Sequence, residues 1–332
     1  MNRRDALIAL LALGDTVVGW PIAARAQEQG KRIPKIGVLW HAANAEEERP
    51  YFGALLDGFR KLGYVEGLNI ALEHRFPNEI PERFRSMAAD LVSLKVDVLV
   101  GVGASSSQYA KNATTIIPVV FIYVPDPVGS KLVESLARPG GNVTGLTNSS
   151  VELTAKRLQY LKELLPGLSR VAFLVNPNAF ITRLYIEEAQ AAAAKLRLTL
   201  HVFEARTLDE LEPAFGAMAK ARVQALAINA EGLLFQGRET IAKLALARRL
   251  PTCVWSKETL EAGALMSYGP DQIAICYRAA AYVDKIIKGT KPMDIPVEQP
   301  TRFQFLINDK TVRALGLKVP QTLLLGADEI LK

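Results

Sequence analysis

The stretch KIGVLW (35–40) is a short apolar run followed by a polar loop and a segment with helical periodicity, and RVAFLV (170–175) begins the same pattern again. A further apolar run follows later in each half, at VDVLVGV (96–102) and at VQALAIN (223–229), and predicts the third strand of that half. Apolar strands that alternate with amphipathic helices are typical of parallel sheets covered on both faces. The sequence therefore predicts an α/β fold with two Rossmann-like lobes.

The segments between these strands are expected to form two helices and one further strand in each half. They span about 47–63, 69–73 and 81–94 in the first half, and about 182–197, 199–203 and 208–221 in the second. A chain of 332 residues is long enough for two lobes that each bury a core.

Three segments rich in turn-forming residues are candidate crossings between the lobes: RPGGNVTGLTN (138–148), SYGPD (267–271) and VEQPTRF (297–303). Ser149 followed by Glu152 is a capping-box pattern, which predicts a helix over 150–165. Three crossings would form a hinge and divide each lobe in the sequence. The expected lobes are residues 33–147 plus 271–300 and residues 148–270 plus 301–332.

The first 26 residues are typical of an export signal. A basic start, Asn2-Arg3-Arg4, precedes an apolar stretch from Ala6 to Leu13, and Ala24-Arg25-Ala26 fits a cleavage site. Asp15 and Pro21 interrupt the apolar span, which favours a cleaved leader over a membrane anchor. The arginine pair fits the twin-arginine route, and Sec export fits equally well. We therefore expect a periplasmic protein.

The composition argues against several other classes of protein. The net charge is +6, but basic residues are interspersed with acidic ones, so no nucleic-acid partner is expected. Cys253 and Cys276 lie in apolar patterns that favour buried free thiols, although export would permit a disulfide. His41, His74 and His201 lie far apart without ligand spacing, so neither a metal site nor a cofactor is expected.

Polar and aromatic residues follow the expected strands, where open parallel sheets bind their ligands. The candidate ligand-binding residues are Trp40, His41, Gly103, Ala104, Ser105, Ser106, Asp126, Asn176, Asn178, Glu231 and Tyr268. Each of them also fits a cap, a turn or the core, and it is their convergence that favours a site. Ser105–Ser107 open an expected helix, whose free N–H groups favour an anion such as a carboxylate.

Other uses of the serine segment fit its sequence less well. The segment lacks the lysine of a phosphate-binding loop and the third glycine of a dinucleotide motif. A catalytic Ser105 would need the second glycine of GxSxG and a base, and neither is evident in the sequence. No catalytic residue is therefore expected.

Several long blocks resemble the ABC-transporter substrate-binding protein family that includes tryptophan- and tyrosine-binding members. They are WPIAARAQ (20–27), GFRKLGYVEGLNI (58–70), PVVFIYVPDPVGSKLVESLARPGGNVTGLT (118–147), LEAGALMSYGPD (260–271) and LLLGADEIL (323–331). The resemblance spans the whole chain and implies a type I-like periplasmic-binding-protein fold with three hinge crossings. It also implies that the lobes close on a small solute and then dock on a membrane permease driven by an ATPase.

By the same resemblance, the segment Gly103–Ser106 would hold a carboxylate and Asp126 would meet an amine. Asn176 and Asn178 would contribute from the second lobe. Glu231 stands where relatives more often have Asp, and Ala104-Ser105 stands where they often have Thr-Pro. These departures leave the kind of solute open between an amino acid and an aromatic acid.

Together these observations predict a monomeric, non-catalytic solute receptor of an ABC uptake system. A periplasmic hydrolase of the same α/β build and a sensory receptor without transport are the alternatives. The effector domain of a regulator shares the fold, but it would need a helix-turn-helix where this chain has a leader pattern.

Overall fold

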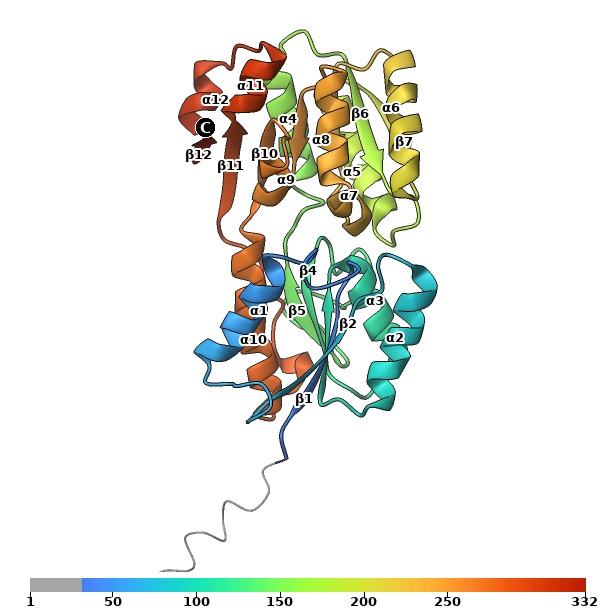
Figure 1. Ribbon diagram of the computed structural model, residues 1–332, viewed down its shortest axis with the longest axis vertical. Helices are drawn as coiled ribbons and strands as arrows, with labels where there is room; N and C mark the ends of the chain where they lie inside the picture. Colours follow the sequence, from blue (N-terminus) through green and yellow to red (C-terminus); the bar gives the residue numbers. More distant parts are fainter. Residues whose placement is uncertain (1–31) are drawn as a thin grey trace, which may run out of the picture. The chain divides into compact units, whose positions relative to one another are not determined.

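A computed structural model describes residues 32–332, of which Pro34–Lys332 form one compact unit (Figure 1). The predicted export signal lies outside the described residues. Within this unit the chain forms two β-sheets, of five and seven strands, with almost entirely parallel pairing. The predicted α/β class is confirmed. None of the helices within residues 32–332 has the length and apolarity that a membrane span requires.

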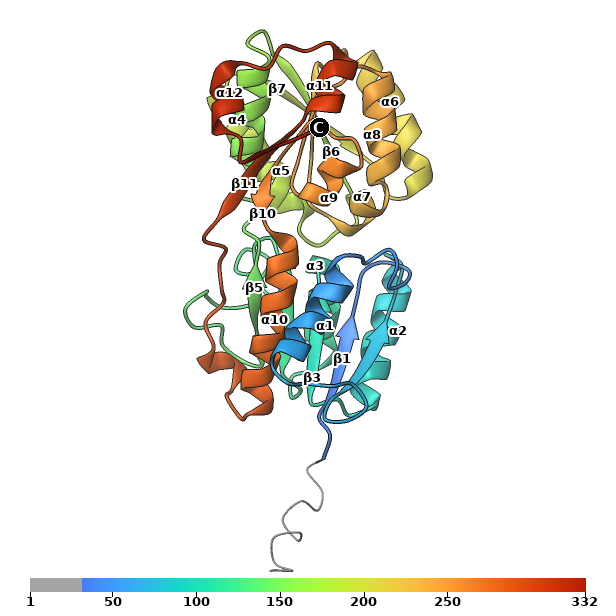
Figure 2. The ribbon, with the colours of Figure 1, turned by 60° about the vertical axis from the view of Figure 1, so that its left-hand side comes forward.

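The five-stranded sheet is parallel throughout, with the order β2-β1-β3-β4-β5. Its strands are β1 (Lys35–Leu39), β2 (Ala71–Arg75), β3 (Val98–Val102), β4 (Val119–Val124) and β5 (Val143–Thr147). Helices α1 (Tyr51–Lys61) and α10 (Gln272–Ile287) cover one face of the sheet, and α2 (Pro81–Ser93) and α3 (Ala104–Ala113) cover the other (Figures 1 and 2).

Both faces of this sheet are buried, which explains why its central strands are continuous apolar runs. Val98 and Val100 of β3 pack in the core that contains α1 and α10, whereas Leu99 packs with Phe84 of α2. Helix α10 comes from far along the sequence and lies against α1 (Figure 2). Gly58 allows this close packing, because a Cβ there would overlap the carbonyl oxygen of Tyr277.

The seven-stranded sheet has the order β12-β11-β10-β9-β8-β6-β7, and only the β10–β11 pair is antiparallel. Its strands are β6 (Arg170–Val175), β7 (Thr199–Glu204), β8 (Ala225–Ile228), β9 (Thr252–Val254), β10 (Met266–Pro270), β11 (Phe303–Asn308) and β12 (Glu329–Leu331). The α-helices that accompany it are α4 (Thr154–Leu164), α5 (Thr182–Lys195), α6 (Leu211–Lys220), α7 (Gly232–Gln236), α8 (Arg238–Ala247), α9 (Lys257–Glu261), α11 (Asp309–Leu315) and α12 (Gln321–Gly326). Two short 3₁₀ helices are η2 (Leu208–Glu210) and η3 (Pro292–Asp294).

The chain passes between the two sheets three times, after β5, after β10 and before β11. Arg157 of α4 ties the first of these connections to β10, since it donates to the Ser150 Oγ at 2.7 Å and to the Tyr268 carbonyl at 2.9 Å. Its side chain is almost fully buried, so these hydrogen bonds replace the water that the guanidinium loses.

Two helix predictions were wrong at their first residues. The first helix begins at Tyr51 rather than near residue 47, because Glu48 instead accepts hydrogen bonds from the backbone N–H groups of His41 and Ala42. The capping box at Ser149 does not form, and α4 begins at Thr154 without a side-chain cap. Ser149 has a φ of 50°, in the left-handed region.

The crossings also differ in detail from the expected segments. The second half of the first segment contains β5, and the crossing follows that strand. Most of the second forms β10, so that crossing is short and centred on Asp271. Cys253 and Cys276 are buried free thiols, which confirms the first of the two alternatives for the cysteines.

Candidate functional site

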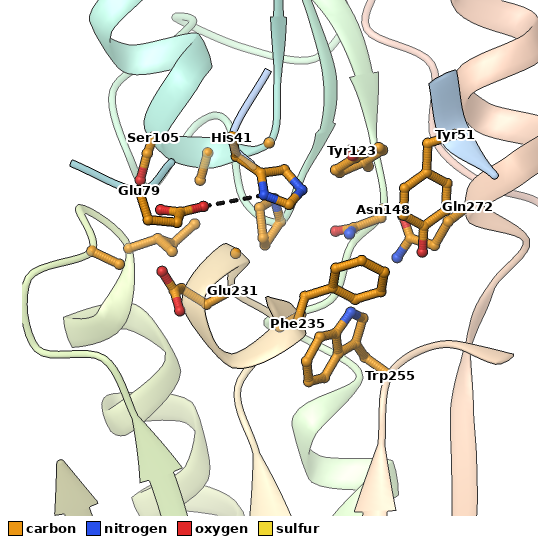
Figure 3. A pocket seen from close by; sticks show the side chains of 17 residues that line it. His41, Tyr51, Glu79, Ser105, Tyr123, Asn148, Glu231, Phe235, Trp255 and Gln272 are labelled. Atoms are coloured by element: carbon orange, nitrogen blue, oxygen red, sulfur yellow. Dashed lines mark ion pairs between the residues drawn. The ribbon is translucent and has the colours of Figure 1, made fainter. Parts of the chain in front are cut away.

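A pocket lies where the carboxyl ends of strands from both sheets face each other (Figure 3). The side of the five-stranded sheet contributes His41, Tyr51, Glu79, Gly103, Ala104, Ser105, Tyr123, Pro125 and Gln272. The side of the seven-stranded sheet contributes Ala179, Ile181, Ala230, Glu231, Gly232, Phe235 and Trp255, and Asn148 lies on the first crossing. The free cavity is about 60 Å³, so the space between these side chains is largely filled.

His41 stands between two carboxylates at one end of the pocket. Its Nε2 lies 3.5 Å from Glu48 Oε2, and its Nδ1 lies 3.2 Å from Glu79 Oε1 (Figure 3). Burial by itself lowers the pKa of His41, but Glu48 and Glu79 outweigh burial and raise that pKa from 6.5 to about 9. The ring is therefore an imidazolium at neutral pH.

Glu231 faces this cluster from the other sheet, at the N-terminus of α7. Its Oε2 accepts from the Leu234 N–H at 3.2 Å, and its Oε1 accepts from Asn176 Nδ2 at 2.9 Å. Burial and the nearby Glu79 carboxylate raise the pKa of Glu231 to about 7, against the effect of the Asn176 hydrogen bond. The carboxyl groups of Glu48, Glu79 and Glu231 outnumber the one imidazolium, and no lysine or arginine lines the pocket in the described part of the chain, so this end favours a positively charged group.

Gly232 permits the close approach of the two sides at this charged end. A Cβ on Gly232 would overlap the Glu79 carboxylate and would lie 3.0 Å from His41 Nδ1. Only a residue without a side chain leaves the ion pair of His41 and Glu79 undisturbed beneath α7.

The N-terminus of α3 supplies free backbone donors to the same pocket. Gly103 precedes the helix with a φ of 91°, and the first N–H groups of a helix have no intrahelical partner. The Ser106 hydroxyl donates to the Trp40 carbonyl at 2.7 Å, and the Ser107 hydroxyl donates to the carbonyls of Gly101 and Gly103. Ser105 is thus the serine of this segment that lines the pocket.

The other end of the pocket is aromatic. The ring of Tyr51 lies 5.6 Å from the rings of both Tyr123 and Phe235, measured between centroids. Trp255 lies beside Phe235, and the amides of Asn148 and Gln272 are the polar groups nearby (Figure 3). This end is suited to a flat, largely apolar group with a polar edge.

Hydrogen bonds join the two sides of the pocket. The Tyr51 Oη donates to Glu258 Oε2 at 2.9 Å, and Gln236 Nε2 donates to Asn78 Oδ1 at 3.0 Å and to Glu47 Oε2 at 3.2 Å. These contacts, together with the small cavity, describe a closed arrangement.

Of the predicted site residues, His41, Gly103, Ala104, Ser105 and Glu231 come together in the pocket. Asn176 does not line it, but its side chain holds Glu231.

The structure does not bring the other predicted residues into the pocket. Trp40 is fully buried, and its Nε1 donates to His74 Nδ1 at 3.0 Å. Ser106 is also fully buried, and its hydroxyl donates to the Trp40 carbonyl. Asp126 accepts from the Gly129 N–H and closes a turn, and Asn178 lies in the turn after β6. The ring of Tyr268 packs against Tyr160 instead.

Several residues that line the pocket were not among the candidates predicted from the sequence. They are Tyr51, Glu79, Tyr123, Asn148, Phe235, Trp255 and Gln272. Glu79 follows the edge strand β2 and has a φ of 54°, a conformation that side chains other than glycine rarely adopt.

Residues 46–331 match the family model described as ABC transporter substrate binding protein. A tyrosine-binding protein of Clostridioides difficile (strain R20291) is 27% identical over 276 residues, which cover 82% of this chain and 79% of that protein.

Two solved structures also resemble the chain. A conserved domain protein from Vibrio cholerae is 27% identical, with a TM-score of 0.85, and the match covers 90% of this chain and all of that one. A domain from Streptococcus pneumoniae in complex with L-Trp is 24% identical over the same shares of the two chains, with a TM-score of 0.84. The family model covers most of the chain, and the two-sheet architecture agrees with it. This protein belongs to the ABC transporter substrate-binding protein family.

Proposed function

We propose that the protein is the extracytoplasmic receptor of an ABC uptake system and closes on a small carboxylate-bearing solute, an amino acid or an aromatic acid. The observation that carries this proposal is a pocket lined from both sheets, with charged groups at one end and aromatic rings at the other. The family to which the chain belongs supports a solute-binding rather than a catalytic role.

The two lobes that would close are residues 33–147 plus 271–300 and residues 148–270 plus 301–332. This division is supported by the sheet composition and by the packing of α10 against α1. A solute that contacts both lobes stabilises the closed state in proportion to its preference for that state over the open one.

The pocket offers a complementary group for each part of an amino acid. The carboxylate would meet the N–H groups of Ala104 and Ser105 at the start of α3, and an ammonium group would lie between Glu79 and Glu231. The side chain would pack among Tyr51, Phe235 and Trp255. The tyrosine-binding relative and the neighbour solved with L-Trp support an aromatic amino acid as the first solute to test.

The export signal, the periplasmic location, the monomeric state and the permease and ATPase partners belong to the same proposal. The leader pattern and the family support them. A sensory receptor without transport would bind the same solute, and the two roles differ in one measurement. Deletion of the gene abolishes uptake of the radiolabelled solute if the protein serves transport, and leaves uptake unchanged if it serves sensing alone.

The hydrolase alternative is disfavoured by the state of His41. A base for Ser105 must be unprotonated, whereas the carboxylates around His41 hold it as an imidazolium by raising its pKa to about 9. Among residues 32–332, no hydrogen bond or ion pair joins Ser105 to His41.

A thermal-shift screen tests the proposal. Binding to the folded state raises the unfolding midpoint by mass action, so aromatic amino acids, other amino acids and aromatic carboxylates are compared at equal concentration. We expect the unfolding midpoint to rise by several degrees with one class of solute. A solute at a hundredfold excess over its Kd stabilises the folded state by about 3 kcal/mol. A flat response to all three classes contradicts the proposal.

A further inference from the structure

The aromatic end of the pocket holds two buried polar atoms that have no hydrogen-bond partner among the described residues. They are the Oη of Tyr123 and the Oε1 of Gln272, and both residues line the pocket. Gln272 is 4% exposed, so solvent does not satisfy its amide. Buried polar groups are nearly always paired in native proteins, and exceptions call for an explanation. In Figure 3 both side chains lie on the side of the pocket away from Glu79.

The backbone at Tyr123 is distorted at this point. Tyr123 has a φ of 43°, and the β4–β5 register shifts between Ile122 and Val124. Such bulges redirect a side chain, and strained residues cluster at binding sites. The strand thus adopts an unfavourable conformation at the residue whose hydroxyl enters the pocket.

Gln272 is fixed by the crossing that precedes it. It is the first residue of α10, and the side chain of Asp271 caps that helix by accepting from the Ala274 N–H at 2.9 Å. Asn148, another polar residue of this end, lies on the first crossing. The polar edge of the pocket is therefore built on the hinge connections.

We infer that the pocket selects a solute whose ring carries an O–H or N–H group at the end that reaches Tyr123 and Gln272, and that these two residues determine specificity. The inference rests on the proposed function and deepens it. Apolar walls from Tyr51, Phe235 and Trp255 would enclose the ring of the solute. A donor or acceptor at the edge of that ring must therefore pair with the protein, because water does not reach it.

A ring hydroxyl fits both orphaned atoms. It donates to Gln272 Oε1 and accepts from the phenol of Tyr123, which stays protonated because burial raises the pKa of Tyr123 well above its usual value. A hydroxyl also fits either orientation of the Gln272 amide, since it both donates and accepts. An indole N–H satisfies the glutamine oxygen alone, and a phenyl ring satisfies neither atom.

Calorimetric titration with solutes that differ by one ring hydroxyl tests the inference. The pairs are L-tyrosine with L-phenylalanine and 4-hydroxybenzoate with benzoate. We expect the hydroxylated member of the binding pair to bind at least about tenfold more tightly to the unaltered protein. In Tyr123→Phe and Gln272→Met this preference should shrink toward unity, while the affinity for the member without the hydroxyl changes by less than about twofold.

Tyr277→Phe is the matched control, because Tyr277 is an exposed tyrosine on the same helix as Gln272. It should leave both affinities unchanged. A purely structural role for Tyr123 would lower the affinities of both members together and would contradict the inference.

The outcomes separate the two claims. If the members of a pair bind the unaltered protein equally, the inference is wrong and the proposed function stands. If none of the four solutes binds, the inference is wrong, and the thermal-shift screen over the wider set of amino acids and aromatic carboxylates decides the proposed function. The comparison on the unaltered protein holds even where a variant fails to fold.

Discussion

Tyr51 and Glu258 are separated by 207 positions in the sequence, yet the Oη of Tyr51 donates a 2.9 Å hydrogen bond to Glu258 Oε2 across the pocket. Tyr51 is the first residue of α1, beside the five-stranded sheet, and Glu258 belongs to α9 of the other side. Glu258 is mostly buried, and burial raises its pKa while the Tyr51 hydrogen bond opposes that rise. The pair therefore stabilises the closed arrangement specifically.

Tyr51→Phe should weaken solute binding. The variant removes a hydrogen bond to a carboxylate, which contributes on the order of 1.5–3 kcal/mol, so we expect affinity to fall roughly tenfold or more. Calorimetric titration measures the change.

Tyr64→Phe is its control, because Tyr64 Oη donates to Asp284 at the same 2.9 Å within one side of the molecule. That change should alter stability and leave affinity unchanged. Equal losses of affinity in the two variants would show that Tyr51 has no special role in closure.

Gly232→Ala should oppose closure at the charged end. The new Cβ would meet the Glu79 carboxylate, which can retreat only by leaving His41. We expect a loss of affinity of about tenfold, since overpacking typically costs about 1–3 kcal/mol. Small-angle scattering should show a larger radius of gyration for the variant with solute than for the unaltered protein with solute.

Gly216→Ala provides the comparison for this glycine. Gly216 lies in α6, and a Cβ there meets nothing within 4 Å. It should stabilise the protein by roughly 0.5–1 kcal/mol without changing affinity, as Ala replaces Gly in a helix interior. If the affinity of Gly232→Ala is also unchanged, closure does not depend on the close approach of α7 to Glu79.

The stability of the solute-free protein should decrease as the pH rises. The pKa of His41 is raised from 6.5 to about 9, so its contribution is complete below about pH 6.5 and is lost as the pH rises through 9. The shift corresponds to on the order of 3 kcal/mol. The pKa of Glu231 is raised from 4.5 to about 7, so its contribution is complete below pH 4.5 and is lost through about 7.

Thermal unfolding between pH 5 and pH 10 checks this behaviour. His41→Gln should flatten the alkaline part of the curve, between roughly pH 7 and 9. His201→Gln, on β7 outside the pocket, should keep the slope of the unaltered protein. A slope that His41→Gln does not change would mean that other groups control the alkaline loss.

Glu79→Gln should lower the affinity for solutes that carry an amine and leave the affinity for solutes without an amine unchanged. If an ammonium group lies between Glu79 and Glu231, the variant should bind L-tyrosine about tenfold more weakly, as a charged hydrogen bond is lost. Its affinity for 4-hydroxybenzoate, which has no amine, should change little. Glu46→Gln is the control, since Glu46 is exposed and pairs with Arg49. Equal effects of Glu79→Gln on both solutes would contradict an amine site at this position.

The fold could be predicted because its main signals are local. Strands such as β3 and β6 are buried on both faces, so they appear as continuous apolar runs, and the intervening helices are amphipathic. Helix starts were less predictable, since tertiary contacts decide them. Glu48, expected inside a helix, instead closes the loop after β1 by accepting two backbone N–H groups.

Part of the pocket could be predicted for the same reason. Residues directly after parallel strands, such as His41 and Ser105, reach it. Trp40 and His41 are neighbours whose side chains point to opposite sides of the chain. The position after a parallel strand therefore did not predict which of the two enters the pocket. Tyr51, Trp255 and Gln272 meet there only because helix α10 and the second sheet return to the first lobe, which no local pattern encodes.

Calorimetric titration of the protein with the solute identified by thermal shift, repeated on Phe235→Ala, shows whether the solute is held between the two sheets. We expect one solute per chain with a Kd of about 1 μM or lower, which corresponds to about −8 kcal/mol. Phe235 lines the pocket from the second sheet and its ring faces Tyr51, so its removal should weaken binding at least tenfold, by roughly 1.4 kcal/mol. Binding with unchanged affinity in Phe235→Ala would contradict the claim that the solute is held in this pocket.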